Sequence, residues 1–254
     1  MSPATHKLVV VRHDYHGRTH RLELDDQTLR TWSCTVLESD PEQGIVLDRS
    51  AFYPGGGGQP PDHGVLLWGG VQTHIVGARP KDDLWLIPAP ADPLPPVGTQ
   101  VRGAIDDVRR TMLMRTHSGL HVLCGVMFRD YGVPVTGGNM EPGEARLDFD
   151  FPEVPPGFKD NLTEALNAEV VADRAIEVRV LPREEAYALG PIIKTATDLL
   201  PPELEVVRLI DVTGLDMQAD GGTHVASTRH IGRIEVAKVE NKGRGFRRVR
   251  IRLP

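Results

Sequence analysis

The sequence predicts an α+β protein in which a small antiparallel β-barrel is followed by an α/β domain. Three observations support this fold class. Up to about residue 87 the chain consists of short β-prone runs separated by Gly, Pro and Asp, which is typical of small barrels. Five prolines follow between Pro88 and Pro96, and beyond them apolar residues recur at helical spacing. We therefore expect a barrel domain over residues 1–95 and a second domain over residues 96–254.

The expected barrel strands are runs rich in Val, Ile, Leu, Thr and Trp. They cover residues 31–38, 44–50, 64–68, 71–78 and 83–87. Strands that are this short and regularly spaced, without helical runs between them, favour an antiparallel barrel. The proline-rich segment is stiff and suits a linker between two domains. The alternative is an ordered loop within one domain.

The second half begins with a long amphipathic helix, expected over about residues 106–131. Asp106 and Asp107 suit its N-terminus, and Gly132 followed by Pro134 ends it. The positions at helical spacing are Leu113, His117, Leu120, His121, Cys124, Met127 and Phe128. The further elements expected are a strand over 145–151, a helix over 156–174, a strand over 175–181 and a closing β-hairpin over 231–254.

Charge is distributed unevenly along the chain. The net charge is −6, yet residues 233–254 carry eight Lys and Arg against two acidic residues. A basic end on an otherwise acidic chain argues against general affinity for nucleic acids and indicates a localised contact.

The two cysteines, Cys34 and Cys124, lie far apart and form no CxxC motif. A disulfide framework is therefore not expected, and Cys124 is interpreted as a buried core residue. No run approaches the roughly 20 apolar residues of a membrane helix, and the N-terminal residues lack a signal peptide's apolar core. We expect a cytoplasmic protein without a membrane partner.

The stretch FYPGGGGQPPDHG, residues 52–64, contains four consecutive glycines. A Walker-type phosphate loop needs a Gly-Lys-Ser/Thr ending that opens a helix. Here the glycines run into Gln59-Pro60-Pro61, which resists helix formation. The GxGxxG spacing of a dinucleotide site is also missing. These features exclude a nucleotide-binding interpretation of the loop.

Histidines occur twice in an HxxxH pattern. We interpret His16 and His20 as incidental, because they lie among short strand-like segments. His117 and His121 lie in the long helix, where residues i and i+4 share one face and suit two ligands of one metal. Because Ser118 stands where a zinc protease has its glutamate, a protease of the HExxH type is excluded.

A third histidine completes a candidate metal site. His224 follows Asp220 by four residues across two glycines, which allow a tight backbone turn. Imidazoles and a carboxylate are accepted Zn²⁺ ligands. Buried, hydrogen-bonded histidines without a metal remain the alternative at this point.

Four motifs in order resemble the AlaX family, the free-standing editing proteins related to the editing domain of alanyl-tRNA synthetase. They are FYPGGGGQPPDHG, HSGLH, ADGGTHV and KVENKGRGFRRVRI, and they span nearly the whole chain. The resemblance implies a barrel followed by an editing domain of the threonyl/alanyl-tRNA synthetase type. It further implies hydrolysis of mischarged tRNA(Ala), carrying chiefly serine or else glycine, and one Zn²⁺ per chain. Its metal ligands would be His117, His121, Asp220 and His224.

Three departures from the family pattern concern the site. Asp220 replaces a cysteine, Ser118 and Leu120 replace threonines, and Thr136 and Asn139 stand where related domains carry Gln and Ser. A carboxylate in place of a thiolate weakens zinc binding, and water would complete the site if Asp220 did not ligate. The substrate pocket is expected to include Ser118, Leu120, Thr136, Asn139, Gly56, Gly57 and Gln59, with Asp62 beside it.

Contacts to tRNA phosphates are expected from the closing hairpin, through Lys238, Lys242, Arg244, Arg247 and Arg248. Two other functions stay open. One is removal of serine from tRNA(Thr), because threonyl-tRNA synthetase has a similar editing domain. The other is a non-catalytic tRNA-binding module with a degenerate metal site, which Asp220 makes conceivable.

Overall fold

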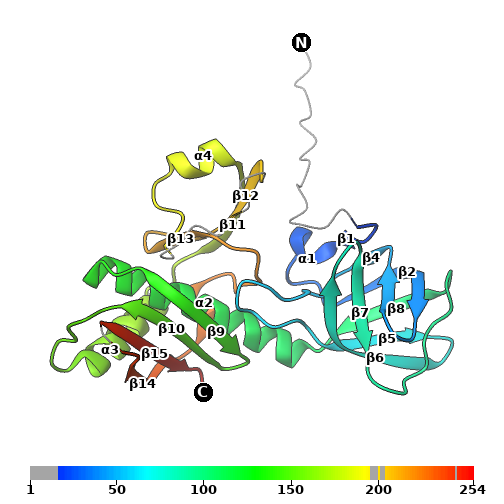
Figure 1. Cartoon of the computed structure of the whole chain (residues 1–254), viewed down its shortest axis with the longest axis horizontal. Helices are drawn as coiled ribbons and strands as arrows, with labels where there is room; N and C mark the ends of the chain where they lie inside the picture. Colours follow the sequence, from blue (N-terminus) through cyan, green and yellow to red (C-terminus); the bar gives the residue numbers. More distant parts are fainter. Residues whose placement is uncertain (1–16, 195–199, 201–203, 244) are drawn as a thin grey trace, which may run out of the picture.

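The computed structural model describes residues 17–194, 200, 204–243 and 245–254, and it confirms the predicted α+β class. Six strands form a closed antiparallel barrel in the order β2-β3-β7-β6-β5-β8, on the right of Figure 1. Their bounds are β2 Thr31–Asp40, β3 Gly44–Leu47, β5 Gly64–Trp68, β6 Val71–Pro80, β7 Leu84–Pro88 and β8 Gln100–Ile105. The short strands β1 (His20–Arg21) and β4 (Arg49–Ser50) pair beside the barrel, next to helix α1 (Leu22–Asp25).

The barrel extends beyond the boundary expected at residue 95. Strand β8 lies after the proline-rich segment and closes the barrel by pairing with β2 and β5. The segment is thus a connection within the barrel and not a linker between domains. The run QVRGAI contains Gly103, and a glycine is not typical of a strand. Here the packing against Trp32 requires a residue without a side chain. A Cβ there would lie 2.4 Å from the ring of Trp32.

Helix α2 (Asp107–Tyr131) joins the two halves of the molecule and confirms the predicted long helix. Asp106 caps its N-terminus by accepting a hydrogen bond from the Arg109 backbone N–H, and Gly132 ends it with a φ of 67°. Most residues between Leu113 and Met127 are buried. In Figure 1 the helix runs from the barrel along the second half of the chain, so both halves contact it.

The described residues of the second half form two antiparallel sheets. The larger has the order β14-β15-β10-β9, and the smaller has the order β11-β12-β13. The bounds are β9 Val135–Glu141, β10 Glu144–Asp150, β11 Ile176–Pro182, β12 Val206–Val212, β13 Asp216–Ala219, β14 Glu235–Asn241 and β15 Phe246–Arg252. Helix α3 (Phe158–Val171) and α2 share one core with the larger sheet, while α4 (Arg183–Ala188) packs with the smaller one. A 3₁₀ turn, η1 (Thr228–Ile231), precedes β14.

The predicted elements of this half are present, but the sequence pattern does not predict β9, β12 and β13 as strands. Strand β9 contains Gly137 and Gly138, which hide its pattern. Both cysteines are free and buried, and burial was expected of Cys124. Within the described part of the chain, no helix is long and apolar enough to span a membrane.

Candidate metal centre and substrate pocket

Three histidines and one aspartate converge next to helix α2. His117 and His121 project from adjacent turns of this helix, and Asp220 and His224 come from the loop after β13. One ligand atom of each residue lies within 4.8 Å of those of the others. The Asp220 carboxylate lies 3.0 Å from His224 Nε2 and 3.5 Å from His117 Nε2. The four residues expected to hold a metal are therefore gathered in one place.

The other nitrogen of each imidazole contacts a neighbouring polar side chain. His117 Nδ1 lies 2.9 Å from Gln59 Oε1, and His121 Nδ1 lies 2.9 Å from Asp216 Oδ2. His224 Nδ1 lies 3.2 Å from Ser118 Oγ. Partners of this kind keep the proton on Nδ1 and leave the lone pair of Nε2 for a metal. The arrangement fits a Zn²⁺ site with outer hydrogen bonds already in place.

Electrostatics also suits cation binding. Burial lowers the pKa of His117 to about 4 and the pKa of His224 well below its ordinary value. Burial alone would raise the pKa of Asp220, but the nearby histidines hold it well below its usual range. At neutral pH His117 and His224 are thus neutral and Asp220 is ionised, the protonation states in which these groups bind metals.

Asp216 is an important residue that the sequence does not indicate. Although burial opposes ionisation, contacts with His121 and Lys194 lower the pKa of Asp216. The Lys194 ammonium forms an ion pair with it, and Gln218 Nε2 donates to it at 2.7 Å. In return Asp216 raises the pKa of His121 against the effect of burial. A carboxylate that orients a ligating histidine in this way is common in zinc sites.

A pocket of about 680 Å³ opens beside these residues. His117, His121 and Asp220 form its polar wall, while Leu120 and Cys124 form part of its apolar wall. The remaining lining residues are Gly57, Gly58, Val135, Thr136, Gly137, Gly138, Asn139, Leu147, Ile193, Leu200, Gln218 and Ala219. The volume is typical of small-ligand sites and is far larger than a seryl group alone.

The residues expected in the pocket separate into two groups. Leu120, Thr136, Asn139 and Gly57 line it. The other three are not among the lining residues. The Ser118 hydroxyl contacts His224 and accepts a hydrogen bond from the Val225 backbone, Gln59 contacts His117, and the carbonyl of Gly56 accepts from the Tyr53 hydroxyl.

Other predicted residues have the following surroundings. Asp62 forms a buried ion pair with Arg110 and lies outside the pocket lining. Cys124 is buried, as expected, and also borders the pocket. Of the incidental pair, His16 lies outside the described residues and His20 contacts Asp25 on the surface. His20 therefore takes no part in the candidate site.

The closing hairpin, β14 and β15, carries its positive charge partly in ion pairs. Asp148 accepts two hydrogen bonds of 2.7 Å from Arg248, and the hydrogen bonding lowers the pKa of Asp148. Lys238 pairs with Glu240 at 2.9 Å. Arg247 bonds neutral partners, the Pro152 carbonyl among them, and Lys242 is exposed. Arg244 lies outside the described residues.

Comparison with known proteins identifies a family match and several relatives of this chain. Residues 207–250 match the family described as the threonyl and alanyl tRNA synthetase second additional domain. The chain is 35% identical over 236 residues to the alanyl-tRNA editing protein AlaX-M of Saccharolobus solfataricus, covering 91% of this chain and 97% of that protein. It is 32% identical over 240 residues to AlaX-M of Methanosarcina mazei, covering 91% and 95%.

A longer relative is the alanine–tRNA ligase of Pyrobaculum aerophilum. It is 34% identical over 228 residues, which is 88% of this chain and 25% of the ligase. The similarity to the two AlaX-M proteins extends over nearly their full length and includes both the barrel and the metal-centre residues of this chain. The chain therefore belongs to the AlaX family of alanyl-tRNA editing proteins.

Proposed function

We propose that the protein is a metal-dependent aminoacyl-tRNA hydrolase that removes serine from mischarged tRNA(Ala). The observation that carries the proposal is the convergence of His117, His121, Asp220 and His224 beside a pocket of about 680 Å³ that the first three of them line. The names of the AlaX-M relatives support alanyl-tRNA editing as the reaction class. A cytoplasmic location stays a prediction, supported by two free thiols.

Editing is needed because a binding pocket for a small amino acid rejects an added hydroxyl poorly, by about a hundredfold. The reverse selection is stronger. A site that hydrogen-bonds the serine hydroxyl leaves its own polar groups unpaired when alanine binds. A second site that reads the hydroxyl can therefore hydrolyse the serine ester and spare the alanine ester.

The three histidines and Asp220 would hold Zn²⁺, which when bound supplies Lewis-acid polarisation of the ester carbonyl. Other residues of the chain hold the candidate ligands in position. Gln59, Asp216 and Ser118 keep the imidazoles oriented. As a ligand, Asp220 would be harder than cysteine and would leave more positive charge on the ion, at the cost of weaker zinc binding.

The wild-type protein should hydrolyse Ser-tRNA(Ala), and Gly-tRNA(Ala) more slowly, while Ala-tRNA(Ala) stays charged. Ser-tRNA(Thr) tests the threonyl-type alternative in the same assay. Release of amino acid from acid-precipitable tRNA measures each rate. Faster hydrolysis of Ser-tRNA(Thr) than of Ser-tRNA(Ala) would replace the proposed substrate. Stability of all four esters would favour a non-catalytic tRNA-binding module.

Thr136 and Asn139 are proposed to read the serine hydroxyl, because they are polar and line the pocket from strand β9. The double variant Thr136→Val/Asn139→Ala should lower the Ser/Ala rate ratio by about tenfold or more, since one neutral hydrogen bond contributes about 1 kcal/mol and the variant removes the polar groups of both residues. Glu141→Ala, on the same strand but outside the pocket lining, is the matched control. An unchanged ratio in the double variant would refute this role.

The hairpin is proposed to contact tRNA phosphates, with Lys242 and Arg247 better suited than Arg248, whose charge Asp148 offsets. Changing Lys242 and Arg247 to Gln should raise KM with little effect on kcat. It should also reduce the slope of log Kd against log salt by about 0.9 for each duplex phosphate that the variant no longer neutralises. Arg252→Gln, paired with Glu144 at the other end of β15, serves as control. An unaltered salt slope would exclude a role for these two side chains in tRNA binding.

A further inference from the structure

The glycine-rich loop between β4 and β5 delivers one side chain to the metal centre. Gln59 is 2% exposed. Its Oε1 accepts from the Thr223 backbone N–H at 3.0 Å and lies 2.9 Å from His117 Nδ1. Its Nε2 donates to the Thr223 hydroxyl at 2.9 Å. The amide oxygen and the amide nitrogen of Gln59 therefore both contact residues of the HSGLH and ADGGTHV motifs.

The glycines of the loop explain how Gln59 reaches that position. Gly56 and Gln59 exchange two backbone hydrogen bonds of 3.0 and 2.9 Å, which closes a tight turn. Gly57 at its tip has a φ of 57°, and a Cβ there would lie 3.5 Å from Asp220 Oδ1. A turn this tight, with positive φ at successive residues, favours glycine. It lets the loop lie against the metal centre with Gln59 pointing inward.

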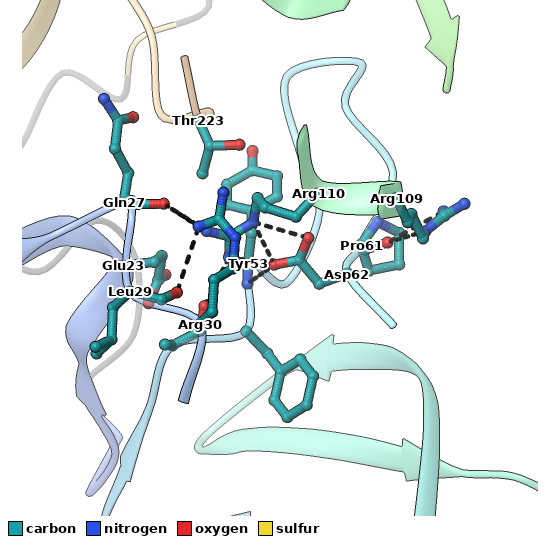
Figure 2. A network of polar contacts seen from close by, with 12 residues as sticks. Glu23, Gln27, Leu29, Arg30, Tyr53, Pro61, Asp62, Arg109, Arg110 and Thr223 are labelled. Carbon is teal, nitrogen blue, oxygen red and sulfur yellow. Dashed lines mark hydrogen bonds and ion pairs between the residues drawn. The ribbon is translucent and has the colours of Figure 1, made fainter. Parts of the chain in front are cut away.

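A second glutamine of the barrel half contacts another ligand residue. The Oε1 of Gln27 accepts a hydrogen bond of 2.9 Å from the backbone N–H of His224. The carbonyl of Gln27 accepts 2.8 Å and 3.0 Å hydrogen bonds from Arg110 and Arg30, as Figure 2 shows. Two glutamines of the barrel half, Gln59 and Gln27, thus contact the HSGLH and ADGGTHV motifs.

A buried ion pair fixes these loops to the helix that carries the first two histidines. The side chains of Arg110 and Asp62 are both fully buried, and Arg110 also donates to the Ala51 carbonyl at 2.7 Å. Figure 2 shows Arg110 between Gln27 and Asp62, with Arg109 bonded to the Pro61 carbonyl. Arg110 lies seven residues, or about two helical turns, before His117. The ion pair therefore fixes the position of the glycine-rich loop relative to helix α2, which carries His117.

We propose that the barrel forms part of the metal centre, with Gln59 as the positioning residue of His117 and Gln27 as that of the His224 main chain. The proposal rests on the metal site of the proposed function and not on its substrate. Oε1 of Gln59 can only accept, so His117 carries its proton on Nδ1 and presents the lone pair of Nε2 to the ion. Without this acceptor the other tautomer and other ring rotations become accessible.

The test measures metal affinity without tRNA. Gln59→Met keeps the approximate shape of the side chain but removes both polar atoms, and it should weaken Zn²⁺ binding by about 10–100-fold in competition with a chromophoric chelator. Gln59→Glu keeps an acceptor for both N–H groups, so its Zn²⁺ affinity should lie closer to wild type than that of Gln59→Met. The visible spectrum of the Co²⁺-loaded protein should change in Gln59→Met and stay near wild type in Gln59→Glu. For Gln27, too, the Met variant should bind Zn²⁺ more weakly than the Glu variant.

Gln100→Met is the matched control, because Gln100 is an exposed barrel residue that bonds Thr35 away from the pocket. Wild-type Zn²⁺ affinity in Gln59→Met would overturn the proposal. Equal weakening in the Met and Glu variants, with lowered thermal stability of the metal-free protein, would assign Gln59 a packing role and also overturn it. Because no ester is present, a failure of the proposed substrate leaves this result unaffected.

Discussion

Replacing Asp62 by alanine is expected to lower the free energy of unfolding by about 3–5 kcal/mol, the cost of leaving one charge of a buried pair without its partner. Arg110 is fully buried against Asp62, so water cannot solvate the remaining guanidinium. The Tyr53 backbone N–H would also lose an acceptor at 2.7 Å. Urea unfolding of the metal-free protein, followed by far-UV circular dichroism, measures the loss.

Two further variants make this result interpretable. Asp62→Asn/Arg110→Met removes both charges and should recover much of the stability, because no uncompensated charge stays buried. Asp25→Ala breaks an exposed contact with His20 and should unfold like wild type. A loss below about 1 kcal/mol in Asp62→Ala, the size typical of exposed pairs, would contradict the buried network of Figure 2.

Gly222→Ala is expected to weaken Zn²⁺ binding by about a hundredfold or more, beyond the effect of removing an outer hydrogen bond. A Cβ at Gly222 would lie 2.3 Å from His117 Cε1, 2.4 Å from Nδ1 and 2.7 Å from Gln59 Oε1. The imidazole is buried and hydrogen-bonded, so either it or the backbone of the loop must shift, and each movement disturbs the arrangement of the candidate ligands. The Zn²⁺ affinity measured by chelator competition and the rate of Ser-tRNA(Ala) hydrolysis should fall together.

The adjacent glycine offers a close control for this variant. A Cβ at Gly221 would meet no atom within 4 Å, so Gly221→Ala should bind Zn²⁺ like wild type. Retention of wild-type affinity in Gly222→Ala would mean that His117 tolerates displacement. The geometry of the metal centre described above would then be wrong at that ligand.

The grouping of the four candidate metal ligands could be predicted, partly because their spacing follows local rules and partly from the resemblance to the AlaX family. His117 and His121 are four residues apart in a helix, and the Gly-Gly step between Asp220 and His224 indicates a tight turn. Their supporting residues could not be predicted in the same way. Asp216 contacts a histidine 95 positions away, and Gln59 contacts one 58 positions away. Only the folded chain brings these partners together.

The fold shows the same contrast between local and long-range information. Capping by Asp106 and Gly132 sets the ends of α2 and is evident in the sequence. Closure of the barrel by β8 depends on pairing with β2 and β5, which the proline-rich segment conceals. Ser118 is expected in the pocket from its place between two histidines. At that place on α2, however, its hydroxyl faces His224 and the Val225 backbone.

Metal dependence of the editing reaction is the central claim, and one measurement tests it most directly. The purified protein is incubated with Ser-tRNA(Ala) and with Ala-tRNA(Ala), before chelation, after chelation and after return of stoichiometric Zn²⁺. The account predicts selective release of serine, a decrease of about a thousandfold on chelation from the removal of several kcal/mol of stabilisation, and recovery with Zn²⁺. Undiminished serine release from protein that contains no metal would contradict it.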